Sequence, residues 1–63
     1  MITGDIIANY GIRQDIARIL SKIPYNARDI CERYKIRFQH EAGISSNELN
    51  NIKNCLDAIA LTK

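Results

Sequence analysis

The residues able to perform chemistry are few and widely spaced in this 63-residue chain. It contains one histidine, His40, and two cysteines, Cys31 and Cys55. A cysteine nucleophile needs a nearby base, and His40 is the candidate partner of Cys31, but a structural role is the favoured interpretation. Asp29 and Glu32 stand one turn apart, a spacing more typical of a solvated helix turn than of an acid–base pair. We therefore expect a protein that is not an enzyme.

Motifs for a metal or a cofactor are also missing. Structural zinc sites use spacings such as C-x-x-C, and phosphate-binding loops are rich in glycine; neither pattern occurs. No apolar leader directs export, so both cysteines are expected to be reduced thiols packed as small apolar groups. No apolar run is long enough to cross a membrane. We expect a cytoplasmic protein without cofactor, metal or membrane contact.

Chain length indicates one domain, residues 1–63, with a small core. A chain of about 60 residues buries only about 60% of the surface that it exposes when unfolded. Without a disulfide or a metal, such a protein depends on regular helix packing or on a second copy of itself. We therefore expect a homodimer.

Positive charge gathers in the middle of the chain, although the net charge is only +2. Between Tyr10 and His40, seven basic residues accompany three acidic ones, whereas each flanking segment carries a charge of −1. This distribution suits contact with a polyanion such as DNA. It also suits an ordinary solvated helix face, which is the more common origin of such a pattern.

Hydrophobic spacing predicts an all-α fold, a small bundle of three or four short helices that resembles a helix-turn-helix. The first helix is expected to begin near Thr3 or Asp5 and to break at Gly11. A second stripe with helical spacing then runs up to Pro24, which cannot lie inside a helix. This stripe consists of Ile12, Ile16, Ile19, Leu20 and Ile23.

Two further helices follow. Asn26 is expected to cap the third helix, and Gly43 to end it. The apolar residues of this helix are Ile30, Tyr34 and Phe38, with Ala27, Cys31 and Ala42 beside them. Ser45 and Glu48 form a capping box before the last helix, in which each side chain satisfies the other residue's backbone N–H. Ile44 and Leu49 hold the hydrophobic-staple positions, and the last helix has its apolar face at Leu49, Ile52, Leu56, Ile59 and Ala60.

The first third of the chain carries a motif seen in known repressors. Residues 5–11 are followed by Gln14, by the triplet Ile16, Ala17 and Arg18, and by Leu20. This pattern resembles the opening of Cro-type helix-turn-helix repressors of lambdoid phages. The resemblance implies that Ala17 lies where two helices cross. It also implies that Arg28 is among the exposed residues of a DNA-reading helix, although Ser21, Lys22 and Pro24 depart from the family's pattern.

A second helix-turn-helix register lies further along the chain. Its apolar and turn positions are Phe38, Ala42, Gly43, Ile44, Leu49 and Ile52. Gln39 takes the helix-crossing position that usually holds alanine. In this register the outward residues of the reading helix are Ser46, Asn47, Asn50, Asn51 and Asn54, and an asparagine amide can pair with adenine in the major groove. Phosphates would be contacted by Arg33, Lys35 and Arg37.

These patterns favour a DNA-binding protein that regulates transcription, of phage or mobile-element type, acting as a homodimer. The candidate DNA-binding residues are Arg28, Arg33, Lys35, Arg37, Asn47, Asn50 and Asn51. The alternative is a non-catalytic, homo-oligomeric adaptor that binds and modulates a host or phage protein through Leu49, Ile52, Leu56 and Ile59. Lys22 and Gln39 count for the adaptor, because a helix-turn-helix prefers smaller or more apolar residues there.

Overall fold

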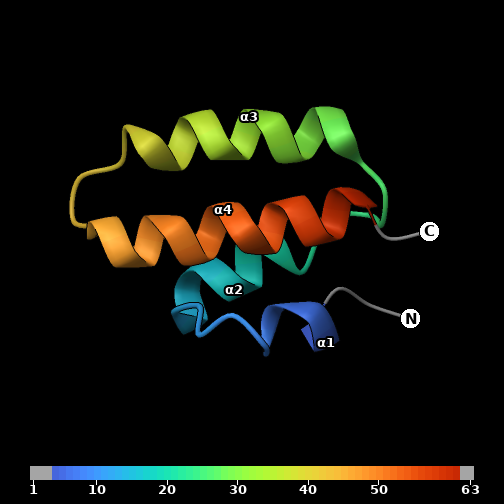
Figure 1. The fold of residues 1–63 in the computed structure, drawn as a ribbon, viewed down its shortest axis with the longest axis horizontal. Coiled ribbons are helices and arrows are strands. Elements are labelled where there is room, and N and C mark those ends of the chain that lie inside the picture. The colour runs from blue at the N-terminus through green and yellow to red at the C-terminus, as the bar shows by residue number, and fades with distance from the viewer. Residues whose placement is uncertain (1–3, 62–63) are drawn as a thin grey trace.

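Four helices build the protein, and the all-α prediction is confirmed. The computed structural model describes residues 4–61. The helices are α1 (Gly4–Ile7), α2 (Gln14–Leu20), α3 (Arg28–Gln39) and α4 (Ser46–Leu61), and no strand occurs among the described residues. Helices α3 and α4 lie side by side and antiparallel, while α1 and α2 lie on the other side of α4 (Figure 1).

The expected interruption between the first two helices is confirmed at Gly11. Its φ is +62°, in the left-handed region that glycine adopts without a steric penalty. Helix α2 begins three residues later and ends at Leu20, before Pro24. The hydroxyl of Ser21 donates to the carbonyl of Arg18 (2.8 Å) and so satisfies one of the free carbonyls at the helix end.

The loop before α3 differs from the expectation that Asn26 caps this helix. Ala27 occupies the cap position and contributes no side-chain hydrogen bond. Asn26 instead has a φ of +63° and donates its backbone N–H to the carbonyl of Ile59 (2.9 Å). It therefore fastens the loop to the last turns of α4. The expected end of α3 at Gly43 is also wrong, because the helix ends at Gln39 and Gly43 lies in the following turn.

The start of α4 contains one half of the predicted capping box. The backbone N–H of Glu48 donates to the hydroxyl of Ser45 at 3.2 Å, as expected. The reciprocal bond is not seen among the described residues, because the Glu48 carboxylate lies 3.5 Å from the Nε of Arg13. A carboxylate in the first turn of a helix remains favourable there, and in this position it also links α4 to the residue preceding α2.

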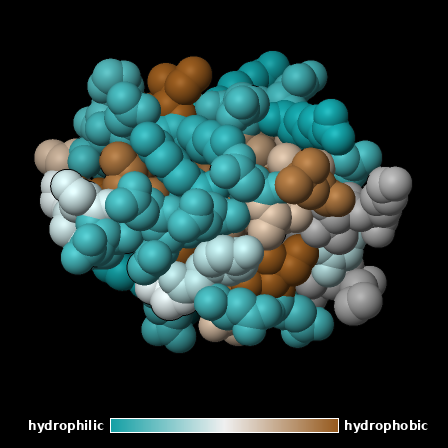
Figure 2. All heavy atoms as spheres, viewed as in Figure 1, coloured by the Kyte–Doolittle hydropathy of each residue, from teal (hydrophilic) through white to brown (hydrophobic). Residues whose placement is uncertain are grey.

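The core is a single cluster in which α4 contributes the most completely buried side chains. Its members are Ile7, Ile16, Leu20, Ile23, Cys31, Phe38, Ile52, Cys55, Leu56 and Ile59. The predicted apolar stripe of α4 is therefore confirmed as core, and it is not the partner-binding surface that the adaptor hypothesis assigned to it. The face of the molecule in Figure 2 is mostly hydrophilic, with small and separate hydrophobic areas.

The relative placement of α3 and α4 differs from the predicted helix-turn-helix. The two helices of that motif meet at roughly 90–120°, whereas α3 and α4 run alongside each other (Figure 1). Gln39, at the predicted crossing position, is exposed at the end of α3. In the earlier register, α2 and α3 are separated by residues 21–27, a longer connection than the usual turn of three or four residues.

Candidate nucleic-acid interface

Lys35, one of the predicted phosphate-binding residues, is used within the fold. Its ammonium forms ion pairs with the carboxylates of Asp57 on α4 and of Glu32 on α3, the second at 3.1 Å. The hydrogen bond with Asp57 is the largest cause that raises the pKa of Lys35 above its usual value. The side chain is 24% exposed. A phosphate would have to displace these carboxylates before Lys35 could bind it.

Arg33 and Arg37 lie on the opposite side of α3. Each is two residues away from Lys35, which corresponds to about 160° around a helix with 3.6 residues per turn. Both are exposed, and neither has a carboxylate within ion-pair distance among the described residues. We call their surface the arginine face of α3.

Tyr34 organises this arginine face, although it was not among the functional residues predicted from the sequence. The guanidinium carbon of Arg37 lies 5.7 Å from the centre of the Tyr34 ring. That ring stacks on Phe38 with centroids 5.8 Å apart, and Phe38 is buried in the core. The Tyr34–Arg37 spacing of three residues is a helical-neighbour pattern, so the sequence held the signal. The stacking limits the positions that the guanidinium can occupy while leaving its N–H groups free to donate.

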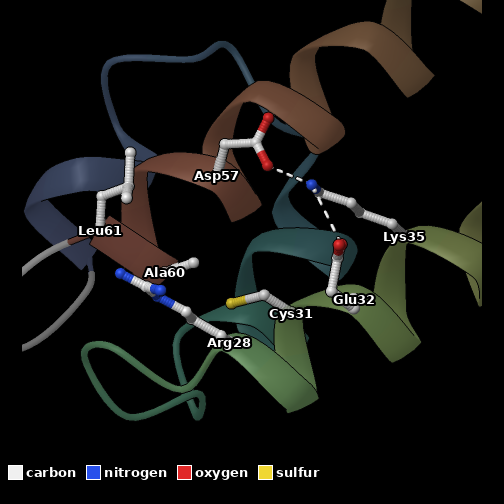
Figure 3. A pocket seen from close by; sticks show the side chains of 7 residues that line it. All are labelled: Arg28, Cys31, Glu32, Lys35, Asp57, Ala60 and Leu61. Carbon is white, nitrogen blue, oxygen red and sulfur yellow. Dashed lines mark ion pairs between the residues drawn. The ribbon is translucent and has the colours of Figure 1, made fainter.

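Arg28 is separate from the other two arginines. It lies five residues before Arg33, or about 140° around the helix, and its side chain points along the groove between α3 and α4, beside Ala60 and Leu61 (Figure 3). The basic DNA-binding candidates on α3, which came from two alternative registers, therefore belong to different surfaces.

The predicted asparagines occupy α4 without forming one surface with the arginine face. Asn47 and Asn50 are exposed, and no hydrogen bond of their side chains occurs within residues 4–61. Asn50 stands seven residues before Asp57, about 20° around the helix, so it shares the side of α4 on which Asp57 meets α3 at Lys35. Asn47 stands ten residues before Asp57, about 80° around the helix. Asn51 is only half-buried and faces the turn at Gly11, where an added Cβ would lie 4.0 Å from its Nδ2.

The dimensions of DNA restrict what α4 can do. The major groove is about 12 Å wide, and one helix with its side chains is already about 10–12 Å across. Because α3 accompanies α4 along most of its length, only the exposed face of α4, which carries Asn47 and Asn50, could face a major groove. The base contacts of these asparagines therefore stay a prediction.

Charge in the described part of the chain is unevenly neutralised. Arg13 lies between the carboxylates of Asp15 and Glu48, just as Lys35 lies between two carboxylates. The basic side chains left without an ion pair within residues 4–61 are Arg18, Lys22, Arg28, Arg33, Arg37 and Lys53. The corresponding acidic side chains are Asp5, Asp29 and Glu41. Two cations thus bind four carboxylates, and the remaining charge is positive.

The chemically reactive residues stay apart. Cys31 is buried and His40 is exposed nine residues later, about 13 Å along the axis of α3. Both thiols are free and buried, as the sequence predicted. Burial raises the pKa of both, and that of Cys55 reaches about 11, so neither is an activated thiolate. Within residues 4–61, no group of three metal-ligating side chains is assembled.

No helix in the described part of the chain has the length and apolar character needed to cross a membrane.

The comparisons with known proteins found no relative of this chain. No family model, curated protein or solved structure matches the chain. The resemblance to Cro-type repressors therefore rests only on residues 5–20 of this sequence.

Proposed function

We propose that this chain is a small, non-catalytic DNA-binding protein with a regulatory role, and that Arg33 and Arg37 contact the phosphates of a duplex. The supporting observation is the charge left over by the ion pairs: within residues 4–61 the unpaired basic side chains outnumber the acidic ones. Phosphate contacts supply most of the affinity of sequence-independent DNA binding.

The arginine face suits this task because it is already ordered. An arginine that stacks on an aromatic ring loses less side-chain freedom when it binds, and its planar N–H groups match phosphate oxygens. Arg37 stacks on Tyr34, which in turn stacks on buried Phe38. Arg33 lies one turn away and adds a second cation within reach of the same backbone.

A homodimer of phage or mobile-element type completes the proposal. The origin rests on the resemblance of residues 5–20 to Cro-type repressors, and the dimer on the small core of a short chain. A dimer would present two arginine faces and so double the number of phosphates contacted. Sedimentation at micromolar concentration should show a species heavier than the 7.2 kDa chain. A monomer alone would contradict the dimer and leave the DNA contact standing.

Fluorescence anisotropy with a labelled random-sequence duplex, measured across a salt series, tests the DNA contact. Arg33→Gln and Arg37→Gln should each weaken binding to every sequence. Each should also reduce the slope of log K against log salt by about one unit. Arg28→Gln is the matched control, because it removes the same charge from the same helix on another side.

Three outcomes would contradict parts of this proposal. A reduced slope with Arg28→Gln but not with Arg33→Gln would move the contact to the other side of α3. A loss confined to one preferred sequence with Asn50→Ala would place base contacts on α4. Failure to bind any duplex at low salt would refute DNA binding altogether.

The adaptor remains a second candidate because of two exposed apolar residues. Ile36 and Leu61 are 61% and 68% exposed, in contrast to the buried stripe of α4. Single exposed apolar residues are common on protein surfaces. The adaptor hypothesis therefore depends on whether Ile36 and Leu61 belong to one surface.

A further inference from the structure

The two most exposed large apolar residues of the described chain lie along one groove between α3 and α4. Leu61 lines one end of it together with Arg28, in a hollow of about 370 Å³ (Figure 3). Ile36 lines the other end together with Lys53, in a hollow of about 430 Å³. Lys35 and Asp57 line both hollows. The two hollows therefore adjoin each other on either side of the Lys35–Asp57 ion pair, and together we call them the α3–α4 groove.

Each end of this groove combines one apolar side chain with one cation. Arg28 and Ile36 belong to α3, eight residues apart, while Lys53 and Leu61 belong to α4 with the same separation. Eight residues of helix correspond to about 12 Å. Because the helices are antiparallel, the cation lies on α3 at one end and on α4 at the other.

The middle of the groove holds one cation between two carboxylates, a net charge of −1, so the unpaired positive charge is at its ends. Lys35 bridges Glu32 and Asp57 across the centre (Figure 3). Neither Arg28 nor Lys53 has a carboxylate within ion-pair distance among residues 4–61. A complementary occupant would carry two apolar groups about two helical turns apart, with a carboxylate beside each of them on opposite flanks.

We infer that the α3–α4 groove binds an acidic amphipathic helix of another protein. Such a helix presents apolar residues seven or eight positions apart, which matches the spacing of the groove ends, and helix-in-groove recognition uses this spacing. The surface lies apart from the arginine face, so a duplex and a partner helix can be bound together.

A second copy of this chain is a poorer occupant of the groove. Pairing two grooves about a two-fold axis would bring no carboxylate to Arg28 or Lys53, so the charge at the groove ends would stay uncompensated. The chain's acidic residues without ion pairs in the described part, Asp5, Asp29 and Glu41, do not line the groove.

The test uses a synthetic helical peptide as the probe and the full chain as the receptor. The peptide is alanine-based, about 20 residues long because shorter helices are only marginally stable, with leucines seven positions apart. One glutamate lies beside each leucine, and the two glutamates lie on opposite sides of the leucine stripe. Two versions of the peptide, or hands, are compared, which differ in the side of the stripe on which the first glutamate lies. Binding is followed by titrating the isotope-labelled protein in ¹H–¹⁵N NMR spectra. We expect one hand to bind with shifts along the groove, and the version with glutamines to bind more weakly.

Variants of the receptor assign the site. Ile36→Ser, Leu61→Ser, Arg28→Gln and Lys53→Gln should each weaken peptide binding roughly tenfold, because each removes one of the four contacts that the groove ends offer. Arg33→Gln, on the arginine face, should leave peptide affinity unchanged while it weakens DNA binding. Because Ile36 and Leu61 are exposed, their replacement should preserve the helical circular dichroism of the protein.

Several results would overturn the inference. It fails if no peptide shifts groove resonances at millimolar concentration, or if the glutamine version binds equally well. It also fails if Arg33→Gln weakens peptide binding as much as Arg28→Gln does. Conversion of a dimer into a monomer by Ile36→Ser or Leu61→Ser would show that a second copy fills the groove instead.

Discussion

Leu56→Ala tests the central claim about α4, that its apolar stripe is the protein's own core. Leu56 is fully buried, and its helical neighbours Ile52 and Ile59 are 1% and 0% exposed. Replacing a buried leucine by alanine costs about 2–5 kcal/mol, and the cost is higher where the site cannot collapse. Since no exposed side chain adjoins Leu56 along the stripe to fill the space, we expect a loss in the upper half of that range.

That loss is large relative to the whole protein. A chain of 63 residues has a free energy of unfolding of roughly 3–9 kcal/mol at the usual value per residue. Urea unfolding followed by circular dichroism should therefore show a much lower midpoint. With a slope of about 1 kcal/mol per molar urea for a small protein, a loss of about 4 kcal/mol lowers the midpoint by about 4 M. A variant already unfolded without urea also agrees with the prediction.

Leu61→Ala is the matched control, because it removes the same atoms from the same helix. Leu61 is 68% exposed, so its replacement should change the free energy of unfolding by less than about 0.5 kcal/mol. Similar effects of the two substitutions would show that α4 is not docked as described. A larger effect of Leu61→Ala would contradict the exposed position of Leu61.

Three other measurements test separate features of the structure. Ser45→Ala removes the acceptor of the Glu48 N–H and should cost about 1 kcal/mol in urea unfolding, whereas Ser46→Ala, which removes no such bond, should have little effect. Gly11→Ala puts a side chain on a backbone with φ of +62° and should cost about 1–2 kcal/mol; an unchanged midpoint would show that the turn is not left-handed. Between about pH 9 and pH 11, the free energy of unfolding should fall as pH rises. The Cys55 thiol of the unfolded chain ionises near its ordinary pKa of 9.0, whereas burial raises the pKa of the folded thiol to about 11. This part of the pH dependence should be absent in Cys55→Ala.

The sequence predicted those features that depend on nearby residues. Gly11 and Pro24 mark breaks between helices because of their own backbone preferences, which any fold must respect. The stripe around Leu56 follows from helical periodicity, and burial of such a stripe is the common means of building a core. The hydrogen bond between Glu48 and Ser45 spans only three residues.

Features set by distant parts of the chain could not be predicted in this way. Asn26 has the chemistry of a helix cap, but its backbone bonds to Ile59, 33 residues later. The partner of Lys35 on α4 became evident only once α3 and α4 were placed side by side. Which basic residues of α3 face α4 and which face away from it depends on the side of α3 that packs against α4. Helical periodicity alone does not specify that side.

The position of α4 in the fold has a consequence for synthesis on the ribosome. Four core residues, Ile52, Cys55, Leu56 and Ile59, lie on this last helix, and α1 packs against it. Until α4 has left the exit tunnel, the apolar side chains of α1, α2 and α3 lack their main neighbour. We therefore expect the nascent chain to remain open until α4 has emerged from the tunnel, because its first three helices cannot complete the core without this helix.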